Sequence, residues 1–215
     1  MKTTLATLSL ATLFLAACGD STQNNAGNTE APHDTIATAA PATPAADPMV
    51  GMKAGMTKMM ADLKAMQPTS DPDHDFAATM RTHHQGAVEM MQAYLPGAGD
   101  AMLRGIAEKG IPKQQGEISE LSTFLSRHQP GAQKSDYGKD AMQIVLDMMA
   151  MDAMPQSADK AFAAMMIPHH ESAVHISQMY ASQGKDETMK AMAKKIADEQ
   201  QKEADVLKKW MQGHP

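Results

Sequence analysis

A nineteen-residue segment that occurs twice constrains the fold of this chain more than any other feature. The copies span residues 76–94 and 162–180, and ten of their nineteen positions are identical at a constant offset of 86. The offset continues downstream, where the identical pairs include Gln114 and Gln200, Gln115 and Gln201, Glu117 and Glu203, Leu121 and Leu207, and His128 and His214. A duplication of this length indicates two tandem structural units of one design.

The apolar residues of both units recur at helical spacing. Between residues 49 and 66 they follow one another at steps of three and four, which places them on one face of a helix: Met52, Met56, Met59, Leu63 and Met66. Further helices are predicted over residues 73–94, 100–128, 140–151, 158–182 and 186–211. No strand or hairpin pattern interrupts them. The expected fold is all-α, with one three-helix repeat over about residues 49–130 and a second over about 131–215.

Two prolines lie inside the predicted helices. A proline ring removes a backbone donor and clashes with the preceding turn. We therefore expect a break or kink near Pro112 and a kink at Pro168, just before the histidines of the second copy.

The first 18 residues have the pattern of an export signal, with Lys2 ahead of a mostly apolar run that ends in small residues. The ending at Cys18 resembles a bacterial lipobox, which predicts a lipid on that cysteine; the alternative is an ordinary secretory signal with an incidental cysteine. Residues 19–48 have the composition of a flexible tether. The expected location is the periplasmic side of a bacterial envelope, with a lipid anchor in the outer rather than the inner membrane.

The cysteine count and the net charge limit which metal ligands and which macromolecular partners the chain can use. Cys18 is the only cysteine, so a lipidated chain keeps no thiol for a disulfide, a metal or a nucleophile. A soft metal would have to bind to the 22 methionines and nine histidines. The net charge of −6 argues against a nucleic-acid partner, because phosphate binding requires a basic face.

Each copy of the repeated segment carries two adjacent histidines: His83 with His84, and His169 with His170. On a helical wheel the first histidine of each pair lies on the apolar line, one turn after Met80 or Met166. Imidazole and thioether groups together suit copper, especially Cu(I). If the halves pack about a pseudo-twofold axis, the pairs can complete one four-donor site; otherwise they serve two. Histidines that only hydrogen-bond across the core are the alternative.

Most of the methionines are assigned to packing. The duplication replaces Met59 by Val145, and such exchange with aliphatic residues is typical of core positions. Met52 and Met56 stay open as additional ligands.

Three other histidines receive weaker interpretations. His175 with Met179 is a candidate secondary surface site, although a solvated pair of Glu171 and His175 is favoured. His128 and His214 end their helices, where a histidine interacts favourably with the helix dipole.

The motif Met-x-x-His-His-x-x-Ala, at Met80–Ala87 and Met166–Ala173, resembles that of the DUF305 family of exported bacterial proteins. The resemblance covers about residues 50–213. It implies a ferritin-like helical bundle and, in some members, periplasmic copper binding of the CopM type. The residues that it carries over as metal ligands are Met80, His83, His84, Met90, Met166, His169 and His170. Ile176 stands where the first copy has Met90, so the second site lacks one thioether.

A ferritin-like architecture does not imply ferritin chemistry. Di-iron bundles use Glu-x-x-His motifs, and the only one here, Glu30 to His33, lies in the predicted tether. We therefore expect copper binding for buffering, tolerance or transfer, without catalysis. The alternatives are a structural or interaction module of the envelope that binds no metal and, third, a ferritin-like redox or metal-oxidising enzyme. Homo-oligomerisation and a delivery partner are left open.

Overall fold

The computed structural model describes residues 47–131, 134–151 and 153–215. The predicted signal segment, Cys18 and almost all of the predicted tether lie outside the described residues. No helix in the described ranges is both long and apolar enough to cross a membrane. Export and lipid anchoring therefore stay predictions.

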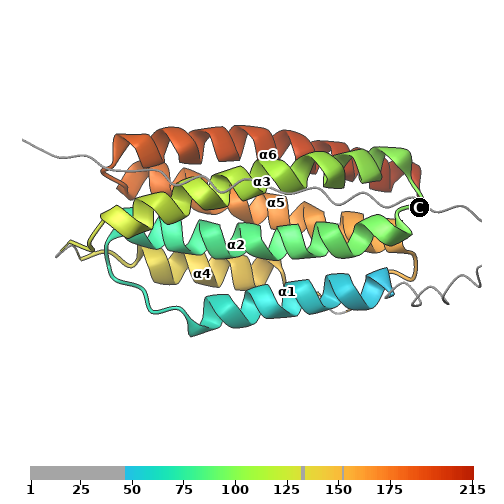
Figure 1. Ribbon diagram of the computed structural model, residues 1–215, viewed down its shortest axis with the longest axis horizontal. Helices are drawn as coiled ribbons and strands as arrows, with labels where there is room; N and C mark the ends of the chain where they lie inside the picture. Colours follow the sequence, from blue (N-terminus) through green and yellow to red (C-terminus); the bar gives the residue numbers. More distant parts are fainter. Residues whose placement is uncertain (1–46, 132–133, 152) are drawn as a thin grey trace, which may run out of the picture. The chain divides into compact units, whose positions relative to one another are not determined.

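Six α-helices make up the described chain (Figure 1). They are α1 (Pro48–Ala65), α2 (Pro72–Tyr94), α3 (Ala101–Arg127), α4 (Tyr137–Met148), α5 (Ala158–Gln183) and α6 (Glu187–Gly213), and a short 3-10 turn, η1 (Leu95–Gly97), follows α2. The described residues contain no strand. The all-α prediction is confirmed, and each helix boundary lies within three residues of the expected one.

Polar side chains fix where the long helices begin. At the start of α2, the Asp73 N–H donates to Asp71 Oδ1 at 3.0 Å. At the start of α6, the Met189 N–H donates to Asp186 Oδ1 at 2.9 Å. Such caps satisfy backbone donors that have no partner within the helix. They hold the ends of the helices that carry the histidines and the residues facing them.

Both internal prolines are accommodated without a break. Pro112 lies inside α3 and Pro168 inside α5, and each helix is continuous there. No break therefore occurs near Pro112, and the kinks expected at Pro112 and Pro168 stay predictions. An internal proline costs about 3 kcal/mol, and the packing of α3 along α2 and of α5 along α6 outweighs that cost.

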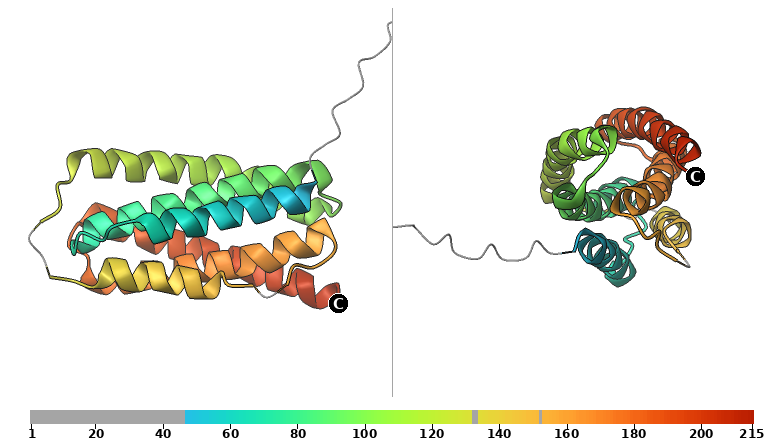
Figure 2. Two further views of the ribbon diagram at one scale, coloured as in Figure 1. Left: turned by 90° about the horizontal axis from the view of Figure 1, so that it is seen from below. Right: turned by 90° about the vertical axis from the view of Figure 1, so that its right-hand side faces the viewer.

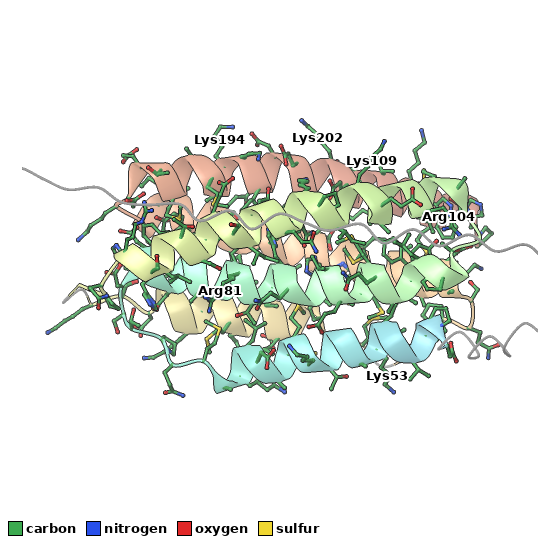
Figure 3. All side chains as sticks on the ribbon, in the orientation of Figure 1. Lys53, Arg81, Arg104, Lys109, Lys194 and Lys202 are labelled. Carbon is green, nitrogen blue, oxygen red and sulfur yellow. The ribbon has the colours of Figure 1, made fainter. Side chains whose placement is uncertain are left out.

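Four helices surround a common centre. α2 packs along α3, α5 packs along α6, and α2 packs against α5. The end view in Figure 2 shows α1 and α4 outside this group, where α1 contacts α2 and α4 contacts α5. Lys53 on α1 and Lys194 and Lys202 on α6 extend outward from the helices (Figure 3). Polar residues at the centre are therefore the exceptions that require an explanation.

Aromatic residues of the repeat pair crosswise between the halves. Phe76 stacks on Tyr180 with ring centroids 4.3 Å apart, and Tyr94 stacks on Phe162 at 4.1 Å. All four residues are fully buried. Exchanging the two repeats turns one contact into the other, because equivalent residues are 86 positions apart. The helices α2 and α5 are therefore related by a pseudo-twofold axis.

The two tyrosine hydroxyls repeat this crosswise pattern. Tyr94 donates to Asp159 Oδ1 at 2.5 Å, and Tyr180 donates to Asp73 Oδ1 at 2.6 Å. Asp73 and Asp159 are again 86 residues apart. Each half thus supplies the acceptor for the other half's tyrosine, which fixes the register of α2 against α5 at both ends.

Candidate metal centre

The two histidine pairs meet at the centre of the four-helix group. His83 on α2 and His169 on α5 stack with ring centroids 3.7 Å apart. The ring of His84 lies 6.1 Å from that of His83, and the ring of His170 lies 5.7 Å from that of His169. All four side chains are at most 1% exposed. We call these residues the four-histidine cluster.

Hydrogen bonds fix which nitrogen is protonated in the two stacked rings. His169 Nε2 lies 3.1 Å from the backbone oxygen of His83, which can only accept, so Nε2 carries the hydrogen. Ser172 Oγ donates to the backbone oxygen of His169 at 2.8 Å and therefore accepts from His83 Nε2, which lies 2.9 Å away. In both rings, Nδ1 is left with the free lone pair.

His170 is oriented by the neighbouring helix. Its Nδ1 donates to Gln200 Oε1 on α6 at 2.9 Å, which leaves the lone pair on Nε2. Within the described residues, the three nitrogens with free lone pairs have no hydrogen-bond partner: His83 Nδ1, His169 Nδ1 and His170 Nε2. A buried polar atom without a partner costs about 1–3 kcal/mol. The fold therefore maintains three imidazole lone pairs that the protein itself does not use.

Burial keeps these imidazoles neutral. It lowers the pKa of His83 and His169 well below the ordinary value, and the neighbouring histidines lower it further. Burial also lowers the pKa of His170, against the opposing effect of Glu203. Neutral imidazole is the form that binds metal ions, so these ligands need not release a proton at neutral pH.

A carboxylate that the sequence left without a role faces the cluster from α3. Glu117 is 3% exposed, and its Oε2 lies 3.0 Å from His84 Nε2 without the alignment of a hydrogen bond. Neither carboxylate oxygen and neither His84 nitrogen has a hydrogen-bond partner in the part of the chain that is described. Burial raises the pKa of Glu117, but His84 and two lysines outweigh it, so the carboxyl is ionised.

The offset of 86 had already matched Glu117 with Glu203. It did not reveal that α3 would bring this side chain to the histidines, because that contact depends on how α3 packs against α2.

The predicted thioether ligands lie in the core of the same helices. Met80, Met90 and Met166 have no exposed surface, and Ile176 is equally buried. Burial is compatible with packing and with metal binding, so their role as ligands stays a prediction. Met52 and Met56 also belong to the core.

A second group of candidate ligands lies at the start of α2. Asp71, Asp73 and His128 each offer one ligand atom within 4.8 Å of the others, and such a group could hold a metal ion. His128 follows the last residue of α3, as expected, but its Nε2 also lies 3.1 Å from Asp71 Oδ2. His128 and Asp71 are 57 positions apart in the sequence, so their contact could not be predicted from residue spacing.

The oxygens of this second group already accept hydrogen bonds from the protein. Asp71 Oδ2 accepts from the Gly131 N–H at 2.7 Å, and Asp73 Oδ1 accepts from the Tyr180 hydroxyl and from the Lys185 N–H at 2.7 Å. A cation would have to compete with these donors. The group therefore serves the fold directly, whereas the lone pairs of the four-histidine cluster do not.

The remaining histidine predictions concern the surface. His175 is exposed, as expected for a solvated residue. Glu171 pairs with Lys208 at 2.5 Å. The proposed surface site of His175 with Met179 stays a prediction. His214 Nδ1 lies 2.8 Å from the backbone oxygen of Trp210, at the end of α6.

Comparison with protein families identifies the repeated unit. The model described as domain of unknown function DUF305 matches twice, over residues 14–125 and 126–211. The boundary between the two matches falls within the last turn of α3, so the first match covers α1, α2 and α3 up to residue 125, and the second covers α4, α5 and α6 up to residue 211. Comparisons with curated proteins and with solved structures find no significant match.

Proposed function

The chain belongs to the DUF305 family, and we propose that it is a metal-binding protein of the bacterial cell envelope whose four-histidine cluster binds copper. One observation carries this proposal. Three imidazole lone pairs, held in fixed tautomers, lie buried and without partners in the described residues. A core that needed histidines only for hydrogen bonding would leave fewer of their nitrogens unused.

The ligand types favour copper. Neutral imidazoles bind first-row ions in the order that places Cu(II) above Zn(II), and thioethers add affinity for Cu(I). The fully buried Met80 and Met166 lie one turn before the histidines on α2 and α5, which places them on the same helix faces. The absence of thiols beyond Cys18 suits an oxidising compartment, where thiols would be oxidised.

We assign the protein a role in buffering, tolerance or transfer of the ion rather than in catalysis. The histidines have almost no exposed surface, so a substrate would not reach a metal held there without movement of the helices. Retention at the membrane through a lipid on Cys18 would keep such a buffer on the periplasmic side of the envelope, and we favour its outer membrane.

Copper titration of the purified protein tests the proposal. We compare the wild type with two double variants, His83→Ala/His84→Ala and His169→Ala/His170→Ala. Each is expected to lower the affinity for copper at least tenfold. Two matched controls remove one histidine outside the cluster: His175→Ala on the exposed side of α5, and His128→Ala at the Asp71 group.

The outcomes separate the alternatives. If both double variants fold, as judged by circular dichroism, and still bind copper like the wild type, the cluster is not the metal centre. Loss of binding in His128→Ala alone would move the site to the group of Asp71 and Asp73. A wild type that binds no copper, together with double variants of lowered thermal stability, would favour the structural module. Turnover of copper or iron by the wild type would favour the redox enzyme.

A further inference from the structure

The duplication puts two glutamates in equivalent positions, but their surroundings differ. Glu117 on α3 and Glu203 on α6 are 86 residues apart, and each faces the second histidine of a pair. The distance from Glu117 Oε2 to His84 Nε2 is 3.0 Å, and the distance from Glu203 Oε2 to His170 Nε2 is 3.6 Å. If the two halves of the site were equivalent, the two carboxylates would lie at the same distance from their histidines.

A lysine makes the two halves unequal. Lys113 Nζ on α3 lies 2.9 Å from Glu203 Oε1 and 2.9 Å from Glu199 Oε2, so it neutralises the carboxylate of the second half. The position equivalent to Lys113 in the second repeat is Glu199, an acid. Among the described residues, Glu117 therefore has no lysine at the distance that Lys113 keeps from Glu203; the lysine in contact with it is Lys195, whose Nζ lies 3.9 Å from Glu117 Oε1.

Exposure differs in the same direction. The Glu203 side chain is 29% exposed, so water can solvate it in addition to Lys113. The Glu117 side chain is 3% exposed, and neither of its oxygens accepts a hydrogen bond from any described residue. Lys195, at 58% exposure, is largely solvated and offers a weak, screened interaction. Glu117 is thus the more buried acid of this pair, and its contacts in the described residues are His84 and the solvated Lys195, with no lysine at hydrogen-bond distance.

We propose that Glu117 is a carboxylate ligand of the ion bound at the four-histidine cluster, that Glu203 is not, and that the site consequently prefers Cu(II) to Cu(I). This inference rests on the proposed function. A carboxylate is a hard oxygen ligand that favours divalent ions, whereas Cu(I) favours soft sulfur. The ion would sit on the first-half side of the pseudo-twofold axis, near His84, because the second half already has its cation in Lys113.

The internal repeat supplies a matched pair of variants, Glu117→Gln and Glu203→Gln. Both remove one carboxylate next to a histidine and keep the side-chain shape. We measure the Cu(II) affinity by competition with a chelator of known affinity, and the Cu(I) affinity anaerobically with a Cu(I)-specific chromophoric chelator. The electron paramagnetic resonance spectrum of the Cu(II) protein gives a readout of the ligand set that does not depend on affinity.

Glu117→Gln is expected to lower the Cu(II) affinity by roughly 10–100-fold, the range found when groups supporting a metal site are removed. It should also change the Cu(II) spectrum and leave the Cu(I) affinity within about threefold, because a carboxylate adds little to Cu(I) binding. Glu203→Gln should leave both affinities and the spectrum unchanged. Should Glu117→Gln not fold, Glu117→Asp, which keeps the charge but withdraws the oxygens, is expected to show a smaller loss and the same change of spectrum.

Two results would overturn the inference. Equal losses in both variants would mean that the site is symmetric and uses both carboxylates or neither directly. An unchanged Cu(II) affinity and spectrum in Glu117→Gln, with the histidine double variants still losing copper, would remove Glu117 from the ligand set but keep the proposed function. If the histidine double variants keep their copper, the proposed function itself is wrong.

Discussion

Ser172 provides a sharp test of how the copper ligands are oriented. Its hydroxyl accepts from His83 Nε2 at 2.9 Å and donates to the backbone oxygen of His169 at 2.8 Å. It therefore fixes which nitrogen of His83 keeps its lone pair, and it ties the two stacked histidines together. In Ser172→Ala both interactions are lost, while the helix keeps a residue with high helical propensity.

The expected changes in stability and in copper affinity for Ser172→Ala follow from these two hydrogen bonds. Each hydrogen bond contributes about 0.5–1.5 kcal/mol to the free energy of unfolding, so the loss of both should lower it by roughly 1–3 kcal/mol in the metal-free protein. Removing a hydrogen-bond partner of a metal-binding histidine typically lowers metal affinity by about 10–100-fold. That range corresponds to about 1.4–2.7 kcal/mol of binding free energy.

Ser177 is the matched control on the same helix. It is 1% exposed, and its hydroxyl has no hydrogen-bond partner among the residues described. Ser177→Ala removes a buried hydroxyl that has no partner, so it should raise stability, by up to about 1–3 kcal/mol, and leave copper affinity unchanged. Urea unfolding of the metal-free proteins and competitive copper titration measure both quantities. Copper affinity within threefold of wild type in Ser172→Ala, or an equal loss in Ser177→Ala, would refute the assignment of the His83 tautomer.

Two further predictions concern the bundle itself. Tyr180→Phe should lower the free energy of unfolding by about 1.5–3 kcal/mol, because its hydroxyl donates to the Asp73 carboxylate at 2.6 Å. Tyr137→Phe loses a hydrogen bond to the neutral backbone oxygen of Ile176, so it should cost about half as much in the same urea experiment. A larger loss in Tyr137→Phe than in Tyr180→Phe would contradict the crosswise register. The metal-free protein should also lose stability as the pH falls below about 6.5. Since the pKa of His83 and His169 is lower in the folded than in the unfolded chain, the unfolded chain binds more protons there, with a slope of up to about 1.4 kcal/mol per pH unit for each histidine. Stability is fully present above that pH, and a flat urea-unfolding profile from pH 7.5 to 5 would show that these histidines are not buried as neutral groups.

The sequence alone determined the parts of this protein that depend on local geometry. Helical periodicity predicted all six helices, because the direction of a side chain on a helix follows from its position within each turn. The same rule placed His83 and His169 on the apolar faces of their helices. The offset of 86 predicted two equivalent halves, and the family model matches both.

Only the tertiary structure decided what those histidines face. Their partners come from other helices: His83 Nε2 meets Ser172, 89 residues away, and His170 Nδ1 meets Gln200, 30 residues away. Glu117 was visible in the duplication, yet its contact with His84 depends on how α3 packs against α2. The different environment of Glu203 depends on Lys113, which reaches from α3 to α6. A repeat records which residues are alike. How two helices pack is set by the surfaces of both, so the inequality of the two halves, and with it the choice of metal ligands, appears only when the chain is folded.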